Sequence, residues 1–135
     1  MEPTTPLLIV DAANVVGSRP DGWWRDRAGA TVRLRDSLAA VRAAGLPPEL
    51  PPAVEVVLVV EGRARDVAGT AAVRVVAAPG SGDDAVVELV AAAPQRRRLV
   101  VTADRELRER VTARGAEVYG PRWLRERIGA PGQSR

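Results

Sequence analysis

Acidic residues follow four apolar stretches of this sequence, at or shortly after the point where each stretch ends. In chain order they are Asp11 after LLIV, Glu61 after VLVV, the pair Asp83 and Asp84 after VRVVAA, and Asp104 after LVVT. Carboxylates that lie close together repel one another, and a divalent cation bound between them removes that repulsion. Carboxylate oxygens are hard ligands of the kind that Mg²⁺ and Mn²⁺ prefer. These acids are therefore candidate metal ligands.

The composition excludes several kinds of catalytic site. The chain has no histidine and no cysteine, and all 20 of its basic residues are arginine. It therefore cannot form a Cys/His zinc site, a Ser-His-Asp or Cys-His catalytic group, or a P-loop, which requires a lysine. Catalysis would then depend on carboxylates, hydroxyls, arginines or the backbone, together with a bound metal. The net charge of +3 permits nucleic-acid binding without arguing for it.

Valine-rich apolar runs predict the strands that must position the acids. Near-continuous β-branched runs suit strands that are covered on both faces, as in a parallel sheet. Helical spacing predicts a helix over GATVRLRDSLAAVRAA, and two later helices each open on an aspartate, which is a favourable N-cap. The expected strands are 7–10, 54–60, 73–78, 98–102 and 117–120, the expected helices are 29–44, 83–93, 104–114 and 121–128, and 12–28 is expected to be a loop.

The alternation of strands and helices predicts one α/β domain built on a parallel sheet. Ligands bind such sheets at the carboxyl ends of the strands, so the acids are expected at one edge. We place the domain at residues 1–128 and a flexible tail at 129–135. No apolar run approaches the roughly 18 residues of a membrane span, and the N-terminus lacks the basic region of a signal peptide. A cytoplasmic protein with no membrane partner is expected.

Three motifs together resemble those of a known enzyme superfamily. IVDAAN, GSGDDAVVEL and VVTADREL occur in this order, at predicted strand ends or helix starts. They resemble the PIN-like nuclease superfamily and are closest to its NYN branch, and the resemblance covers nearly the whole chain. It implies a three-layer α/β/α domain whose five-stranded parallel sheet has the order 3-2-1-4-5. It also implies metal-dependent cleavage of RNA, with Mg²⁺ or Mn²⁺ as the cofactor.

The resemblance carries roles onto particular residues. The register of the pair Asp83 and Asp84 is ambiguous by one residue, so either can be the ligand. Glu61 substitutes for an acid that many members carry between the first two strands. The first motif has two alanines after its aspartate, where the family often has glycine. The implied catalytic residues are Asp11, Asp83, Asp104 and Asn14, the implied metal ligands are Asp11, Asp83, Asp84, Asp104 and Glu61, and Thr102 matches a hydroxyl residue near the last acid.

Arginines and two adjacent tryptophans lie near the predicted strand ends. Bases of single-stranded RNA stack on tryptophan, and arginine binds phosphate through two hydrogen bonds. Alternatively, the adjacent tryptophans anchor their loop to the neighbouring helix. Trp123 is expected in the core, and Arg96–Arg98 are expected to be a solvated surface run. The expected substrate-binding residues are Arg19, Trp23, Trp24, Arg63, Thr102 and Arg105.

Other interpretations remain open at this point. VVEGRARD resembles a strand end of the Toprim fold, but that fold needs a later D-x-D, where this chain offers only Asp104 and Glu106. The same metal site could serve a phosphohydrolase of free nucleotides. The chain could also be a non-catalytic PIN-like module that binds RNA or a partner protein. PIN-like proteins are often dimers, so a homodimer is considered as well.

Overall fold

Five parallel strands form the central sheet. The computed structural model describes residues 4–18 and 22–128, and only the backbone of Trp23. The sheet has the order β3-β2-β1-β4-β5, and every neighbouring pair is parallel. The predicted parallel sheet in the order 3-2-1-4-5 is thus confirmed. Its strands are β1 (Leu7–Asp11), β2 (Glu55–Val60), β3 (Arg74–Ala77), β4 (Arg98–Val101) and β5 (Glu117–Tyr119).

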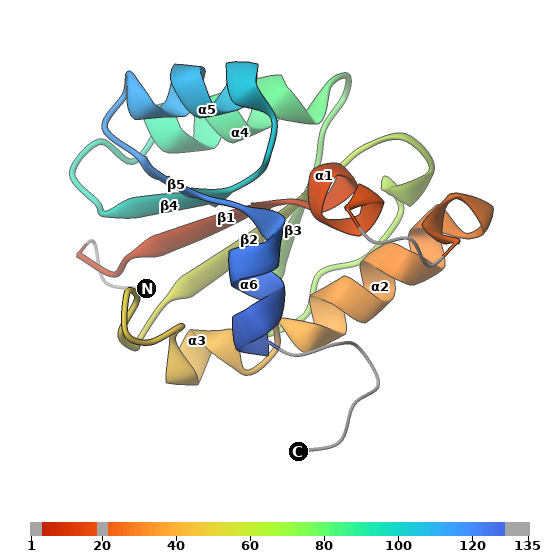
Figure 1. Cartoon of the computed structure of the whole chain (residues 1–135), viewed down its shortest axis with the longest axis horizontal. Coiled ribbons are helices and arrows are strands. Elements are labelled where there is room, and N and C mark those ends of the chain that lie inside the picture. Colours follow the sequence, from red (N-terminus) through yellow and green to blue (C-terminus); the bar gives the residue numbers. More distant parts are fainter. Residues whose placement is uncertain (1–3, 19–21, 129–135) are drawn as a thin grey trace.

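Helices cover both faces of this sheet, which gives the predicted three layers (Figure 1). One face packs against α4 (Gly82–Ala91) and α5 (Arg105–Thr112). The helices on the other face are α1 (Ala12–Gly17), α2 (Arg27–Ser37), α3 (Val41–Ala44) and α6 (Pro121–Ile128).

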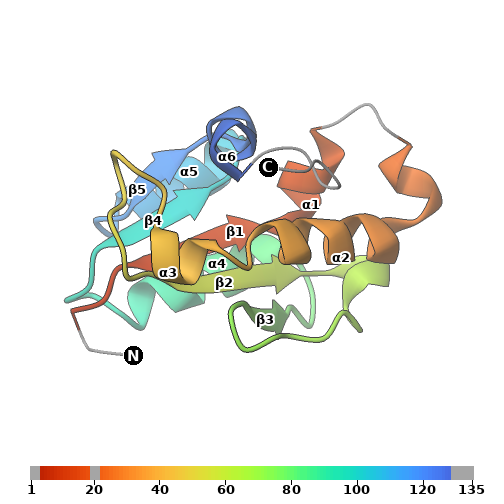
Figure 2. The same ribbon diagram turned by 90° about the horizontal axis from the view of Figure 1, so that it is seen from below.

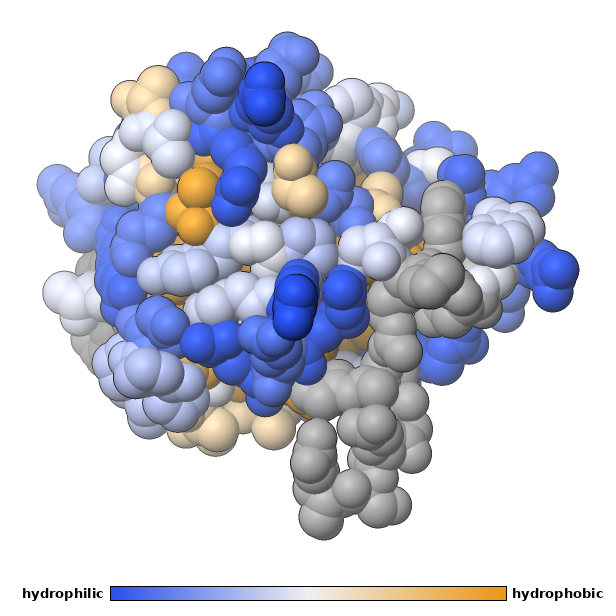
Figure 3. All heavy atoms as spheres, in the orientation of Figure 1, coloured by the Kyte–Doolittle hydropathy of each residue, from blue (hydrophilic) through white to orange (hydrophobic). Residues whose placement is uncertain are grey.

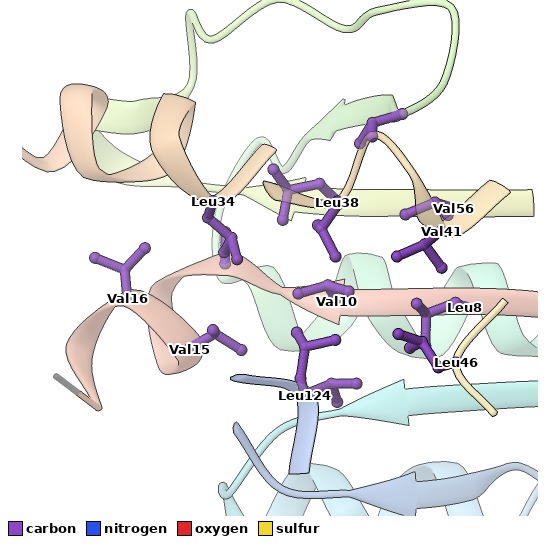
Figure 4. Close-up of a cluster of buried hydrophobic side chains, with 14 of the residues drawn as sticks. Leu8, Val10, Val15, Val16, Leu34, Leu38, Val41, Leu46, Val56 and Leu124 are labelled. Carbon is purple, nitrogen blue, oxygen red and sulfur yellow. The ribbon is translucent and has the colours of Figure 1, made fainter. Parts of the chain in front are cut away.

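Successive residues of the central strand enter two separate cores. In β1, Leu8 and Val10 pack in the core that contains α2, α3 and α6, which Figure 4 shows. Leu7 and Ile9 pack in the core beneath α4 and α5. A strand with an apolar layer on each side needs no alternation with polar residues. This is why continuous valine-rich runs encode the sheet.

The single helix predicted over 29–44 is wrong, because two helices with a turn between them occupy this stretch. α2 ends at Ser37 and α3 begins at Val41. Between them the backbone N–H of Leu38 donates to the carbonyl oxygens of Leu34 and Arg35, and the N–H of Val41 donates to that of Leu38. Hydrogen bonds that span only three residues tighten the chain locally. The tightened turn places Leu38 and Val41 together in the core.

The stretch 12–28, predicted as one loop, contains a helix directly after β1. α1 begins at Ala12 with Asp11 as its N-cap, and a short 3-10 helix, η1 (Trp23–Arg25), precedes α2. The six residues AANVVG are too few to show helical periodicity, and valine has a lower helix propensity than unbranched residues. Figure 2 shows α1 and the start of α2 beyond the carboxyl ends of β1 and β2.

The run Arg96–Arg98, predicted to be solvated, contains one buried arginine. Arg98 is 6% exposed, and its guanidinium donates to the carbonyl oxygens of Val90 at 2.8 Å and of Arg96 at 3.0 Å. Val90 lies in the last turn of α4, where the helix dipole favours a positive charge. The prediction is therefore wrong for Arg98, which joins the start of β4 to the end of α4.

Within residues 4–18 and 22–128, no helix has the length and apolar character that crossing a membrane requires. The predicted flexible tail, 129–135, lies outside the described residues.

Candidate functional site

Asp11 ends the central strand and is almost completely buried, at 6% exposure. Its Oδ2 accepts a hydrogen bond of 3.0 Å from the Thr102 hydroxyl, and its Oδ1 accepts one of 3.5 Å from the backbone N–H of Asn14. Burial raises the pKa of the Asp11 carboxyl from 3.8 to about 6, although these hydrogen bonds act in the opposite direction. The negative charges of Asp83 and Glu61 add to the rise. Asp11 is therefore a carboxylate that the fold holds at an electrostatic cost.

Hydrogen bonds tie the first acidic motif to the last one. The Thr102 hydroxyl, while donating to Asp11, accepts a hydrogen bond of 3.1 Å from the backbone N–H of Asp104. The Asn14 side-chain oxygen accepts one of 2.7 Å from the backbone N–H of Ala103. The loop between β4 and α5 is thus fixed against α1 by two polar side chains. The contact of Asn14 explains its position three residues after Asp11.

Asp104 is the N-cap of α5, as the sequence predicts. Its Oδ1 accepts a hydrogen bond of 2.9 Å from the backbone N–H of Leu107. The cap fixes the carboxylate at the carboxyl edge of the sheet, and its negative charge raises the pKa of Asp83. Capping and site formation are therefore compatible roles for this residue.

Asp83 is not an N-cap, which corrects the sequence prediction. Ser81 caps α4 instead, and its hydroxyl oxygen accepts a hydrogen bond of 3.1 Å from the backbone N–H of Asp83. The carboxylate of Asp83 therefore does not cap its own helix. Its pKa is raised by partial burial and by the charges of Asp104 and Glu61. The signal that sequence reading missed is the serine two residues before the acidic pair.

Glu61 follows the end of β2 and reaches the start of α4. Its Oε2 accepts a hydrogen bond from the backbone N–H of Gly82. A Cβ at Gly82 would lie 3.1 Å from this oxygen, so the glycine permits the close approach. Glu61 also raises the pKa of both Asp11 and Asp83. The substitute acid chosen from the sequence thus lies in the same electrostatic environment.

Asp84 points to a different partner from its neighbour. Its carboxylate forms an ion pair of 3.1 Å with Arg110 on α5, and its side chain is 73% exposed. The ambiguity within the acidic pair therefore has a structural counterpart: the charges of Asp104 and Glu61 raise the pKa of Asp83, whereas Asp84 pairs with an arginine.

The donor chemistry of the acids suits Mg²⁺ or Mn²⁺, since every candidate ligand is a carboxylate oxygen. In the described parts of the chain, no three acidic side chains converge closely enough to hold a metal ion between them. Magnesium commonly binds through only one or two carboxylates together with substrate phosphates and several waters. The set Asp11, Glu61, Asp83 and Asp104 fits that mode of binding better than a closed protein cage.

The residues predicted to contact the substrate differ in how exposed their side chains are. Arg63 and Arg105 are exposed near the strand ends, and Trp24 is 56% exposed with the Arg25 guanidinium 5.7 Å from its ring centre. Thr102 is completely buried, so its predicted substrate contact is replaced by a positioning role beneath Asp11. Arg19 and the side chain of Trp23 lie outside the described residues.

Arginine side chains are frequent on the helices beside the site. The face seen in Figure 3, over α5 and α6, is mostly hydrophilic. Trp123, predicted in the core, is partly buried and packs against the core cluster. Its ring stacks on that of Tyr119, with 4.2 Å between the ring centres. The arginines of these two helices are Arg105, Arg108, Arg110, Arg122, Arg125 and Arg127.

No protein-family model matches this chain, and no curated protein sequence matches it. Solved structures do match its fold, among them Rae1 (YacP) from Bacillus subtilis and a tryptophan-to-leucine mutant of that protein. The mutant aligns with a TM-score of 0.72 and 19% identity over 90% of this chain and 74% of its own. Rae1 (YacP) itself aligns with a TM-score of 0.72 and 17% identity over 90% of this chain and 72% of its own. The chain has a PIN-like fold. At this level of identity the match establishes the fold alone, so the roles of the acids depend on their own geometry.

Proposed function

We propose that this PIN-like protein is a metal-dependent endoribonuclease of the NYN branch, which hydrolyses phosphodiester bonds of single-stranded RNA. Asp11, Asp83, Asp104 and Glu61 are the candidate ligands, of which one or two would hold Mg²⁺ or Mn²⁺ together with substrate phosphate and water. When bound, the ion would lower the pKa of a water molecule and stabilise the charge that develops on the leaving oxygen.

The observation that carries this proposal is the gathering of negative charge at the carboxyl edge of the sheet. Asp11 is buried with a raised pKa, and the charges of Asp83 and Glu61 contribute to that rise. Several arginines pair with other carboxylates, among them Arg97 with Glu117 and Arg110 with Asp84, and the charge of Arg110 lowers the pKa of Asp83 less than burial and the neighbouring acids raise it. Backbone contacts explain the positions of Asp11, Asp104 and Glu61 one by one, but the repulsion between the gathered carboxylates still lowers stability. A cation that binds there would offset the repulsion.

The protein's own residues supply positioning. Thr102 orients Asp11 through a hydrogen bond from its hydroxyl, and Asn14 holds the loop that carries Asp104. The side chains of Arg63 and Arg105 are exposed near the same edge and would bind phosphates on either side of the reacting one. None of these roles requires a histidine base, which agrees with a chain that has no histidine.

An extended substrate is favoured over a free nucleotide by the surroundings of the acids. Trp24 offers an exposed flat ring on which a base can stack, and several arginines lie on neighbouring helices. A polymer presents phosphates and bases in succession, and can contact these separated groups at the same time.

The test is hydrolysis of a fluorescently labelled single-stranded RNA by the purified protein, in Mn²⁺ and in EDTA. We expect cleavage only with Mn²⁺, products that carry a 5′-phosphate, and no cleavage by Asp11→Asn. The matched control is Asp36→Asn, an exposed aspartate on α2 that pairs with Arg35 away from the site, and it should cleave normally.

Two outcomes would contradict the proposal in different ways. Hydrolysis of mononucleotides with no binding of single-stranded RNA at low salt would identify a nucleotide phosphohydrolase. Binding of RNA without Mn²⁺-dependent cleavage would identify a non-catalytic module.

A further inference from the structure

A small cavity, here called the side pocket, opens beside the acids at the carboxyl edge of the sheet. Its volume is about 180 Å³, and it lies between α1, the first turns of α2 and η2 (Gly62–Ala64). Its apolar lining includes Ala13 and Ala64, and its polar lining consists of Arg27, Thr31 and Glu61. Glu61 belongs to both places, since its charge also raises the pKa of Asp11 and Asp83. Whatever occupies the side pocket therefore lies next to the reacting phosphate of the proposed reaction.

We propose that the side pocket binds one guanine base of the RNA substrate and so sets the sequence preference of the enzyme. This inference rests on the proposed ribonuclease function. It assigns a binding role to Ala13 and Arg27 that the sequence motifs do not reveal.

The lining of the side pocket narrows the chemistry of its ligand. A phosphate group would be attracted by Arg27 but repelled by the Glu61 carboxylate, and a metal ion would find only that one carboxylate in the lining. Pockets that enclose whole drug-sized ligands begin at about 300 Å³, so a space of 180 Å³ suits a fragment such as a single base. A nucleobase has apolar faces and polar edges, which match the alanines and the polar side chains of the lining.

The two charged side chains of the lining select among the bases. Glu61 accepts a hydrogen bond from the Gly82 N–H at Oε2, and Oε1 is the second acceptor of the same carboxylate. Arg27 reaches from α2 towards η2, where its Nη1 would lie 3.7 Å from a Cβ at Gly62. Guanine presents O6 and N7 as acceptors, the pair that arginine binds bidentately, and N–H donors on its adjoining edge. A carboxylate and a guanidinium on one pocket thus match guanine.

The side pocket owes its space to small side chains. Ala13 lines the side pocket and is exposed, so a larger residue there would fill part of the space without disturbing the core. Ala43 on α3 is a matched control, because it is also an exposed helical alanine and lies away from the lining.

The experiment measures binding of short single-stranded RNAs by fluorescence anisotropy in EDTA, where no cleavage occurs. The RNAs are oligouridines with a single central guanosine, inosine, adenosine, cytidine or abasic residue. We expect the guanosine RNA to bind about ten-fold more tightly than the adenosine, cytidine and abasic ones, with inosine between them because it lacks the amino group. This comparison needs no variant of the protein.

Variants locate the preference in the side pocket. Ala13→Leu should remove most of the preference for guanosine while Ala43→Leu keeps it, with thermal melting showing that both are folded. Glu61→Gln should lower the preference as well, because its amide oxygen would be held by the Gly82 N–H and its NH₂ group would then face the base.

The outcomes separate this inference from the function on which it rests. Equal affinity for all central bases, in a protein that cleaves RNA, overturns the guanine site and leaves the ribonuclease standing. A guanosine preference that survives in Ala13→Leu places the base elsewhere and also overturns the inference. Failure of the protein to bind or cleave RNA at all overturns the proposed function and the guanine site together.

Discussion

Replacing Asp11 with asparagine should stabilise the folded protein at neutral pH while it abolishes hydrolysis. The carboxyl is 6% exposed, and its pKa in the folded protein is about 6 against an ordinary value of 3.8. Each pKa unit corresponds to about 1.4 kcal/mol, so the ionised carboxylate lowers the free energy of unfolding by about 3 kcal/mol at pH 7.

Asparagine retains only part of the hydrogen bonding of the carboxylate. Its amide oxygen can accept from the Thr102 hydroxyl, but its NH₂ group then faces the backbone N–H of Asn14 and loses that hydrogen bond. This loss costs about 1 kcal/mol, which leaves a net stabilisation of about 2 kcal/mol. For a domain of this size such a change corresponds to a rise in melting temperature on the order of 8 °C.

The effect should depend on pH in a defined direction. Because the folded-state pKa is raised, the native protein binds the proton more tightly than the unfolded chain between pH 3.8 and about 6. The stability of the wild-type protein therefore falls as pH rises through this window, and Asp11→Asn does not share that fall. The difference in melting temperature should be small or reversed near pH 4 and should reach its full value above pH 6.

The assay is thermal unfolding of both proteins from pH 4 to pH 7 in EDTA, followed by circular dichroism. Asp36→Asn, whose side chain is 61% exposed, is the control and should show no such pH-dependent stabilisation. A lower melting temperature for Asp11→Asn at pH 7, or a difference that does not change with pH, would refute the reasoning. Asp11 would then be a structural residue.

Three further predictions concern other parts of the structure. Arg98→Leu should lower the free energy of unfolding by about 1–3 kcal/mol, because it leaves the carbonyl oxygen of Val90 without its donor. The control Arg97→Leu changes an exposed neighbour and should lower it by less than about 1 kcal/mol. Urea unfolding measures both, and equal losses would contradict this prediction. Asn14→Ala should reduce the kcat for RNA cleavage and leave the melting temperature nearly unchanged, and an unaltered kcat would show that its contact with the neighbouring loop is dispensable. Trp24→Ala should weaken binding of single-stranded RNA by about ten-fold at unchanged Mn²⁺ affinity, since stacking contributes about 1–3 kcal/mol per base, and binding by the wild-type protein should fall steeply with salt; parallel losses of metal and RNA affinity would contradict it.

The sheet could be predicted from sequence because each strand has a simple composition. Runs such as LLIV in β1 are buried on both faces of the sheet. Such continuous apolar runs indicate a parallel sheet, and the residue at which each run stops marks the end of its strand. The resemblance to PIN-like nucleases then implied the strand order, which continuous runs alone leave undetermined. The positions of the acids at strand ends follow from the same reading.

Details that depend on contacts distant in sequence could not be predicted. The burial of Arg98 depends on the end of α4 coming close to the start of β4, and nothing local to a run of three arginines distinguishes the buried one. The contact of Thr102 with Asp11 could not be predicted either, since a hydroxyl two residues before an acid could contact either substrate or protein. The N-cap of α4 was a local error, because Ser81 and Asp83 are both good caps and the chain uses the earlier one.

The hydrogen bonds of the site fix the acids before any ligand binds. Thr102 connects Asp11 with the backbone of Asp104, and Glu61 connects the end of β2 with the start of α4. These contacts hold the carboxylates against their mutual repulsion, so the cost of gathering the charges falls on folding and not on binding. A cation or a polarised substrate that arrives there meets dipoles and charges that need little rearrangement, which is how preorganised sites stabilise transition states. The lowered stability expected from Asp11 comes mainly from the burial of its charge, with a smaller contribution from the neighbouring acids, and a cation bound at this edge of the sheet would offset part of it.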